Sequence, residues 1–308
     1  MRLLVVGAGA TGGYFGGRLA AAGRDVTFLV RPHRAAQLHA DGLRIVSPHG
    51  DLMVHPKLIA VGDSMAPFDA VLLAIKAYSL DAAMNDCASS VGPATMILPV
   101  LNGMRHVDAL RDRFGENALV GCVCKIASVM DGEGRIVQLT GVHDLAYGEM
   151  NGEQSARMEQ LNAFMQVAGF DATHSHSIER EMWEKWVMLA SIGAVNCLMR
   201  GTIGEVEAAR GGTGVALQIL EEVIAIVTAL GHPLRQEFVR SMKDLLTRKD
   251  SETTSSMYRD LESGSRVEAD QIIGDLLARA STAGVGTPLL TATYAHLSVY
   301  QNQLVGRV

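Results

Sequence analysis

The first seventeen residues constrain the fold of this chain more than any other stretch. Residues 3–6 are a short apolar run, Leu-Leu-Val-Val, which predicts a buried strand. Glycines at positions 7, 9 and 12 follow directly in the spacing G-x-G-x-x-G, and residues 14–22 predict a helix. A strand, a glycine turn and a helix in this order form the unit that binds a dinucleotide.

Each glycine of this motif has a physical purpose at a phosphate site. Gly7 permits a tight turn, Gly9 lets the backbone approach a pyrophosphate, and Gly12 lets the helix pack closely on the strand. The start of the helix adds unpaired N–H groups and a partial positive charge. The expected cofactor-binding residues are Gly7, Ala8, Gly9, Ala10, Thr11 and Gly12. A merely structural glycine turn is the alternative, but the position directly after a strand favours the dinucleotide site.

The end of the next predicted strand, residues 25–30, bears on the choice of cofactor. A site for NAD usually has an acidic residue there, which binds the ribose 2′-hydroxyl. This chain has Arg31 instead, with Arg34 one turn later, and guanidinium groups can bind a 2′-phosphate through paired hydrogen bonds. We therefore expect NADP (NADPH) rather than NAD. Two surface arginines that open a helix are the alternative interpretation.

Two further apolar runs, residues 70–75 and 95–100, predict buried parallel strands that end in polar residues. Lys76 follows the first run and Asn102 the second. Ligands of doubly wound sheets bind outside the carboxyl ends of the strands, so both side chains are candidates for contact with a cofactor or substrate. A solvated loop lysine and a turn asparagine before Gly103 are the alternatives.

Strands and helices alternate in the first part of the chain, and helices alone follow from Glu179. Residues 43–46 and 51–54 predict a hairpin, and residues 119–128 and 136–139 predict further strands. The predicted later helices span residues 180–199, 214–230, 235–247, 265–280 and 289–304. We expect an α/β chain with a Rossmann-type, doubly wound parallel sheet in residues 1–178 and an all-helical domain for substrate and catalysis in residues 179–308.

Composition argues against several classes of partner. The chain has 308 residues, of which 48% are hydrophobic and 19% charged, as in globular proteins, and its net charge is −6. No basic stretch stands out, so nucleic acid is not expected as a partner. The absence of a signal peptide and of an uninterrupted membrane-length segment predicts the cytoplasm and no membrane. The spacing of the four cysteines predicts buried thiols and no metal site.

Two charged residues in the helical part are candidates for acid–base chemistry. Lys185 precedes a long apolar stretch, and a buried ammonium group is costly unless it is paired or used. Burial generally makes a lysine a better proton donor near neutral pH, whereas an ion pair with Glu181 is the structural alternative. Glu268 could equally belong to the acidic first turn of a helix. The residues alone leave both roles open.

In combination, these elements resemble the ketopantoate reductase family (2-dehydropantoate 2-reductase) over nearly the whole chain. The matching elements are the glycine motif, Arg31, Lys76, Leu101-Asn-Gly-Met104, Trp183-Glu-Lys185, Ser255-Ser-Met-Tyr-Arg-Asp260 and Glu268-Ala-Asp270. The resemblance implies NADPH-dependent reduction of a 2-oxo acid to a 2-hydroxy acid. The implied substrate is ketopantoate, the precursor of pantoate in pantothenate biosynthesis, or a close analogue.

The resemblance also implies roles for single residues. Lys185 matches the general acid, and Glu268 matches the acid that orients this lysine and the substrate hydroxyl. Ser256 matches a contact to the substrate carboxylate, and Arg31 matches the arginine for the 2′-phosphate. Lys76 and Asn102 match residues along the cleft for nicotinamide and substrate, where Glu268 is also expected to contact the cofactor.

One departure from the family pattern concerns the substrate. The family usually has asparagines one and two turns after the catalytic lysine, where this chain has Leu189 and Gly193. Asn196 could replace them in substrate binding only if the helix kinks, because it lies roughly 16 Å beyond Lys185 along an ideal helix. We therefore expect a more apolar pocket than in the family.

The sequence is compatible with three functions, which differ in the reaction and in whether any reaction takes place. The first is the 2-oxo acid reductase, whose partner is a small-molecule substrate. For this enzyme we expect a homodimer as the oligomeric state. The second is a dehydrogenase of another hydroxy acid or of an opine-like substrate on the same fold. The third is a non-catalytic NADP-sensing protein, which Lys185 and Glu268 argue against. Fold alone does not decide among them.

Overall fold

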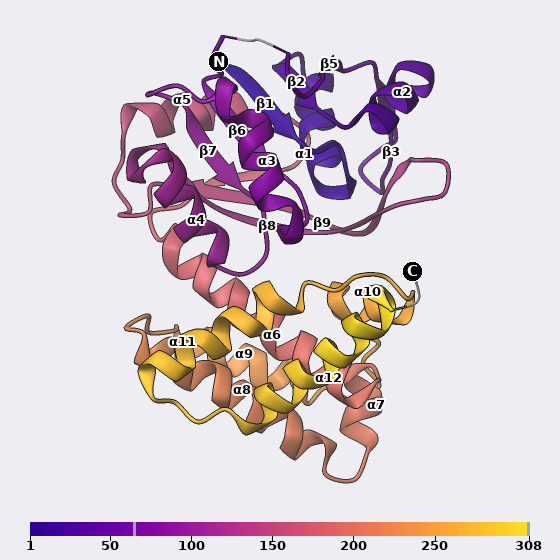
Figure 1. Cartoon of the computed structure of the whole chain (residues 1–308), viewed down its shortest axis with the longest axis vertical. Helices are drawn as coiled ribbons and strands as arrows, with labels where there is room; N and C mark the ends of the chain where they lie inside the picture. The colour runs from indigo at the N-terminus through magenta and orange to yellow at the C-terminus, as the bar shows by residue number, and fades with distance from the viewer. Residues whose placement is uncertain (64–65, 307–308) are drawn as a thin grey trace. The chain divides into compact units, whose positions relative to one another are not determined.

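The computed structural model describes residues 1–63 and 66–306, which divide into two compact units (Figure 1). The first unit contains residues 1–101 and 106–179, and the second contains the chain from Arg180 onward together with the short segment 102–105. The first unit has the parallel sheet and the second is helical, so the predicted fold class is confirmed.

Within the described residues, the first sheet has five parallel strands in the order β5-β2-β1-β6-β7. The strands are β1 (Arg2–Val6), β2 (Asp25–Leu29), β5 (Lys57–Ile59), β6 (Ala70–Leu73) and β7 (Met96–Pro99). Strands β1 and β6 are almost fully buried, which explains their continuous apolar sequences. Because β2, β1 and β6 are neighbours, their carboxyl ends bring the glycine turn, Arg31 and Lys76 to one edge of the sheet.

A second, mixed sheet is the main difference from the expected architecture. It consists of β3 (Leu43–Val46), β4 (Leu52–Val54), β8 (Gly121–Met130), β9 (Ile136–Gly148) and β10 (Asp171–His174). The predicted hairpin is confirmed, since β3 and β4 pair antiparallel. The strands after residue 119, however, do not extend the first sheet. β9 pairs in parallel with β3, at Ile45 with Ile136, and antiparallel with β8.

Helix α1 (Ala10–Ala21) packs against both sheets, and its glycines permit this close approach. A Cβ at Gly16 would lie 2.7 Å from the ring of Phe28 in β2, whereas a Cβ at Gly17 would lie 2.7 Å from Leu43 in β3. Residues 12–13, one turn earlier, repeat the arrangement, because positions four apart share a helix face. The glycine-rich sequence of α1 therefore serves packing on two sides.

The other helices of the first unit connect these strands. They are α2 (Pro32–Asp41), α3 (Leu80–Cys87), α4 (Arg105–Phe114) and α5 (Ala156–Met165), with short 3-10 turns η1 (Ala77–Ser79), η2 (Ala88–Ser90) and η3 (Glu116–Ala118).

The second unit contains α6 (Ile178–Met199), α7 (Ile203–Ala208), α8 (Gly212–Ala229), α9 (Gln236–Leu246), α10 (Ser256–Glu262), α11 (Asp275–Ala283) and α12 (Pro288–Val305). The helix predicted over 265–280 differs from the prediction. Residues 265–268 are not helical, and Asp270–Gly274 form a π-helical turn, η4, before α11 begins. Hydrophobic periodicity does not distinguish such a turn from an α-helix.

Helix α8 is the one helix in the described chain that is long and apolar enough, by length and composition, to cross a membrane. Its position in the second unit gives it another purpose. Ile219, Val223 and Ile226 are fully buried, and α8 packs against α7, α9, α11 and α12. Its Glu222 accepts hydrogen bonds from backbone N–H groups in the first turn of α12. We therefore describe α8 as the core helix of this unit.

Candidate active site

The turn between β1 and α1 has the geometry that a pyrophosphate requires. Gly7 has φ +96°, and a Cβ there would lie 2.6 Å from the carbonyl oxygen of Ala74, so another residue would be strained. At Gly9, by contrast, a Cβ would meet no atom within 4 Å, so a ligand has room to approach the backbone. Gly9 begins α1 without a side-chain cap, which leaves the first N–H groups of the helix for an anion.

Arg34 and Arg31 differ in their contacts, although both were expected near a 2′-phosphate. The Nε atom of Arg34 donates to the carbonyl of Ala8 at 3.1 Å, and Nη1 donates to the carbonyl of Gly134 at 3.0 Å. Burial lowers the pKa of Arg34. Arg31 is exposed at the N-cap of α2, and its guanidinium makes no hydrogen bond or ion pair with any described residue. Arg34 therefore shapes the turn, and Arg31 is the arginine available to a ligand.

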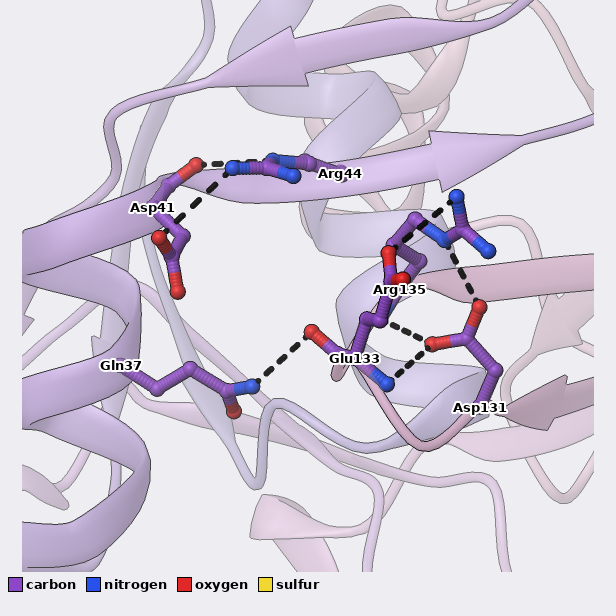
Figure 2. Close-up of polar contacts among 6 residues, drawn as sticks. All are labelled: Gln37, Asp41, Arg44, Asp131, Glu133 and Arg135. Atoms are coloured by element: carbon purple, nitrogen blue, oxygen red, sulfur yellow. Dashed lines mark hydrogen bonds and ion pairs between the residues drawn. The ribbon is translucent and has the colours of Figure 1, made fainter.

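The turn between β8 and β9 contacts α2 through a hydrogen bond and is itself stabilised by Asp131 (Figure 2). The carboxylate of Asp131 accepts hydrogen bonds from the backbone N–H groups of Glu133 and Arg135 and from Nε of Arg135 at 2.7 Å. Arg135 thereby lowers the pKa of Asp131. Gln37 of α2 donates to the carbonyl of Glu133 at 3.1 Å. The helix that follows Arg31 is thus held by a turn that lies far away in the sequence.

Lys76 and Asn102, the two polar residues at strand ends, belong to different units. Lys76 is exposed after β6 in the first unit, where its backbone begins the η1 turn. Asn102 follows β7 but belongs to the second unit, where its Nδ2 atom donates to Oε2 of Glu268 at 3.4 Å. The structure therefore brings Asn102 and Glu268, which are far apart in the sequence, into direct contact.

The neighbours of Lys185 in α6 are buried side chains. Trp183, Glu184 and Trp186 are buried. Glu184 accepts hydrogen bonds from the backbone N–H and the guanidinium of Arg235, which raises the pKa of that arginine. The ammonium group of Lys185 takes part in no hydrogen bond or ion pair among residues 1–63 and 66–306, so the alternative pair with Glu181 is not formed.

The exposed stripe of α6 indicates what surrounds this lysine. Glu181, Lys185, Met188 and Leu189 are partly exposed at helical spacing, whereas the positions between them are mostly buried. Beyond Lys185 the stripe is apolar. Helix α6 is continuous through Gly193, where a Cβ would lie 2.7 Å from Cε of Met257. The methionine therefore occupies space that an asparagine at this position would need.

Glu268 is a buried carboxylate, with 5% of its surface exposed, directly before the π-helical turn. Its backbone carbonyl accepts a hydrogen bond from the N–H of Ile272 at 3.1 Å. A buried polar group needs hydrogen-bond partners, and Asn102 supplies one to this carboxylate. The second unit thus contains both the half-buried Lys185 and the acid Glu268, which accepts a hydrogen bond from Asn102.

Asn196 and Ser256 occupy different environments. Asn196 is fully buried, and its Oδ1 accepts from the N–H of Ser255 while Nδ2 donates to the carbonyls of Gly201 and Thr253. Its carboxamide thereby joins α6 to the segment before α10. Ser256 is the first residue of α10 and is partly exposed.

Two aromatic residues that the sequence did not single out contact the turn after Glu268. The indole Nε1 of Trp186 donates to the carbonyl of Ile272 at 3.0 Å. The hydroxyl of Tyr294 donates to Oδ1 of Asp270 at 2.6 Å, and this carboxylate raises the pKa of Tyr294. The adjacency to Lys185 was a weak signal for Trp186, and no local pattern signals Tyr294.

Comparison with known proteins gives consistent matches over both units. The family profile described as "Ketopantoate reductase PanE/ApbA" matches residues 3–152, and "Ketopantoate reductase PanE/ApbA C terminal" matches residues 177–301. The "Uncharacterized oxidoreductase YkpB" of Bacillus subtilis (strain 168) is 35% identical over 98% of this chain and 99% of its own length. The 2-dehydropantoate 2-reductase of Mesorhizobium japonicum is 28% identical over 96% of each chain.

Solved structures of the same architecture include two with different activities in their names. The 2-dehydropantoate 2-reductase from Geobacter metallireducens GS-15 has a TM-score of 0.87 at 27% identity, and the match covers 97% of this chain and 99% of that one. D-mandelate dehydrogenase with NADH and anilino(oxo)acetate has a TM-score of 0.86 at 18% identity, with 99% of each chain covered. The second similarity shows a common fold.

Proposed function

Since the chain belongs to the ketopantoate reductase family of oxidoreductases, we propose that it reduces a 2-oxo acid to the 2-hydroxy acid with NADPH. The proposed substrate is ketopantoate or a close analogue with more hydrocarbon. The observation that carries the proposal is the uncommitted ammonium group of Lys185, in the unit that also holds the Asn102–Glu268 contact. No disulfide joins the four buried cysteines in the described part of the chain, which suits the cytoplasm as its compartment.

The proposed chemistry assigns one task to each polar group. Hydride addition to the ketone carbon, which NADPH supplies when bound, leaves negative charge on the former carbonyl oxygen. Lys185 stabilises this charge and donates the proton that completes the hydroxyl group, after which solvent reprotonates the amine. We assign Glu268 to orient the lysine and the hydroxyl, Ser256 to the substrate carboxylate, and Lys76 to an anionic group of cofactor or substrate. Asn196 then has a positioning role, because its carboxamide is committed to backbone groups.

Arg31 supports the choice of NADPH over NADH. Its guanidinium is exposed directly after β2, at the place where NAD sites usually have an acidic residue. No described carboxylate neutralises it. An uncommitted guanidinium at this place suits a 2′-phosphate and has no matching group on NADH.

The apolar stripe beyond Lys185 supports a substrate with fewer hydroxyl groups than ketopantoate. Met188 and Leu189 follow the lysine on the partly exposed side of α6, and Gly193 packs against Met257. In a site without hydrogen-bonding groups, each hydrocarbon group of the substrate raises kcat/KM modestly. A hydroxyl group of the substrate finds no partner there and does not raise kcat/KM. We therefore expect 2-oxo acids with branched aliphatic or aromatic side chains to be reduced at least as well as ketopantoate.

The test is NADPH oxidation by the purified protein with a panel of 2-oxo acids: ketopantoate, pyruvate, 2-oxoisovalerate and phenylglyoxylate. Lys185→Ala should lower kcat by at least ~10²-fold with nearly unchanged NADPH affinity, because it loses a proton donor and a charge. Lys243→Ala, an exposed lysine of α9 in the same unit, is the matched control and should behave as wild type.

Two outcomes would contradict the proposal. If NADPH binds but no member of the panel is reduced, a cofactor-sensing protein becomes the better explanation. If Lys185→Ala keeps most of the wild-type kcat, the proton comes from another group, with Lys76 as the first to test. Best activity with ketopantoate itself would contradict only the expectation of an apolar substrate.

A further inference from the structure

The π-helical turn η4 contacts residues that adjoin the proposed active-site residues in the sequence. Trp186, next to Lys185, donates its indole N–H to the carbonyl of Ile272 at 3.0 Å. Gly103, next to Asn102, lies so close that a Cβ would be 2.5 Å from the carbonyl oxygen of Gln271. Glu268 leads directly into the turn. All these residues belong to the second unit.

Gly103 and Trp186 also approach each other at this turn. A Cβ at Gly103 would lie 3.7 Å from Nε1 of Trp186, and Gly103 has φ +79°, a conformation that other residues adopt only with strain. Trp186 is 1% exposed and Ile272 is 2% exposed. A carbonyl buried this deeply needs a hydrogen-bond partner, so the indole N–H is important for the turn.

Tyr294 of α12 holds the turn at both of its ends. Its hydroxyl donates to Asp270, the first residue of η4, at 2.6 Å. Its ring packs on Gly274, the last residue, where a Cβ would lie 3.0 Å from Cε2 of the tyrosine. A wide π turn is uncommon and is found frequently at functional sites, which agrees with so many specific contacts on five residues.

We propose that η4 is a positioning element that fixes Glu268 and Asn102 relative to the Lys185 segment, with Trp186 and Tyr294 as its positioning residues. The indole N–H acts through the Ile272 carbonyl and holds the turn against α6. Loss of this hydrogen bond lets the turn move, and the Asn102–Glu268 contact at its entry moves with it. The catalytic part of this inference rests on the proposed function, whereas the structural part does not.

Trp183 offers a matched control on the same helix. Its ring centroid lies 5.3 Å from that of Trp186, and both rings lie under the guanidinium of Arg279, at 5.9 Å and 5.6 Å. Trp183 is also buried, but its Nε1 has no hydrogen-bond partner among the described residues. Replacement by phenylalanine therefore removes a hydrogen bond at position 186 and none at position 183.

The experiment compares Trp186→Phe with Trp183→Phe in the full chain, by amide hydrogen exchange and by kinetics. We expect Trp186→Phe to accelerate exchange several-fold in residues 268–274 and in residues 102–104, with Trp183→Phe near wild type. In the active enzyme, Trp186→Phe should lower kcat by about ten- to a hundredfold, because a misplacement of catalytic groups by about 1 Å can cost about 10²-fold in rate. NADPH affinity should stay unchanged, so that the loss is confined to kcat.

The outcomes separate this inference from the proposed function. If wild type reduces no 2-oxo acid, the proposed function fails, and the exchange data alone decide whether η4 positions the two segments. Equal exchange in the two phenylalanine variants overturns the inference. Faster exchange with unchanged kcat also overturns it, because the turn would then be only structural. If Trp186→Phe does not fold, Tyr294→Phe, which loses the hydrogen bond to Asp270, provides the same measurements with the same expected directions.

Discussion

Two arginines three positions apart, Arg31 and Arg34, have opposite environments. Arg31 is exposed with an uncommitted guanidinium, whereas Arg34 is half-buried and donates to carbonyls of the glycine turn and of the β8–β9 turn. The sequence shows two cations at the start of one helix and does not distinguish them. The distinction depends on Gly134, which a pattern around residue 31 does not include.

This difference between Arg31 and Arg34 predicts two kinds of loss. Arg31→Ala should weaken NADPH binding by about 1.5–3 kcal/mol, or roughly ten- to a hundredfold, and leave NADH binding unchanged. Arg34→Ala should weaken the binding of both cofactors and lower the free energy of unfolding by about 1–3 kcal/mol, because the carbonyls of Ala8 and Gly134 lose their donor. Titrations with both cofactors and urea unfolding give these quantities. Equal losses of NADPH and NADH in Arg31→Ala would contradict the 2′-phosphate assignment.

At the scale of elements, the β8–β9 turn is joined to α2 by hydrogen bonds from Arg34 and Gln37. Gly134 has φ +74°, and a Cβ there would overlap the amide of Gln37 (Figure 2 shows Gln37 beside the turn). Gly132 lies in the same turn, but a Cβ there would meet no atom within 4 Å. The two glycines thus differ in what a methyl group would disturb.

Gly134→Ala should lower the free energy of unfolding by about 1–3 kcal/mol, the usual cost of a left-handed conformation in a residue with a side chain. It should also weaken NADPH binding, because α2 carries Arg31 at its start. Gly132→Ala is the control and should leave both quantities within experimental error. Similar free energies of unfolding for the two variants, measured with urea, would contradict the prediction, because the turn would then accommodate a side chain at position 134 without strain.

Elements formed by local interactions could be predicted from the sequence, whereas elements that depend on residues far apart in the sequence could not. β1 and β6 are buried on both faces, so their apolar runs identify them locally. The second sheet could not be predicted, because it depends on pairing between Ile45 and Ile136. For the same reason, the π turn escaped prediction, since a distant indole N–H contacts it.

The candidate site divides in the same way. The glycine motif and Lys185 stand out locally, since their neighbours in the sequence define their surroundings. The contact between Asn102 and Glu268 arises only from the tertiary structure. Resemblance to the family named both residues but said nothing of the geometry that joins them.

At the scale of the whole molecule, a buried polar network connects α1 to the second sheet. The hydroxyl of Tyr14 donates to Gln138 and contacts Nδ1 of His143, each at 2.8 Å. The ring of His49 stacks on His143 with centroids 3.8 Å apart. Burial and the neighbouring His49 lower the pKa of His143. Protonation of His143 is therefore less favourable in the native state than in the unfolded chain.

The sign of this shift predicts an acid-sensitive stability. The unfolded histidine has a pKa of about 6.5. The contribution of the neutral His143 ring to stability is fully present above that pH and is lost as the pH falls from there through the lowered pKa of the folded state. The melting temperature of wild type should thus fall on acidification from about pH 7.5 to about pH 5.5. His143→Asn should reduce this fall, and His39→Asn, an exposed histidine of α2, should not. An identical pH dependence in wild type and His143→Asn would exclude the network as its source.

The position of α1 between two sheets has a consequence for biosynthesis. The first sheet is complete once Pro99 has left the ribosome, but the second sheet needs strands that end at His174. Until those strands emerge, Gly13 of α1 and Ile45 of the hairpin lack the contacts with Ile136 that they have in the folded protein, and apolar surface stays uncovered in the nascent chain. Such surface is a target for chaperones. The cofactor-binding unit is therefore completed late in translation, by residues far from the motif that identifies it.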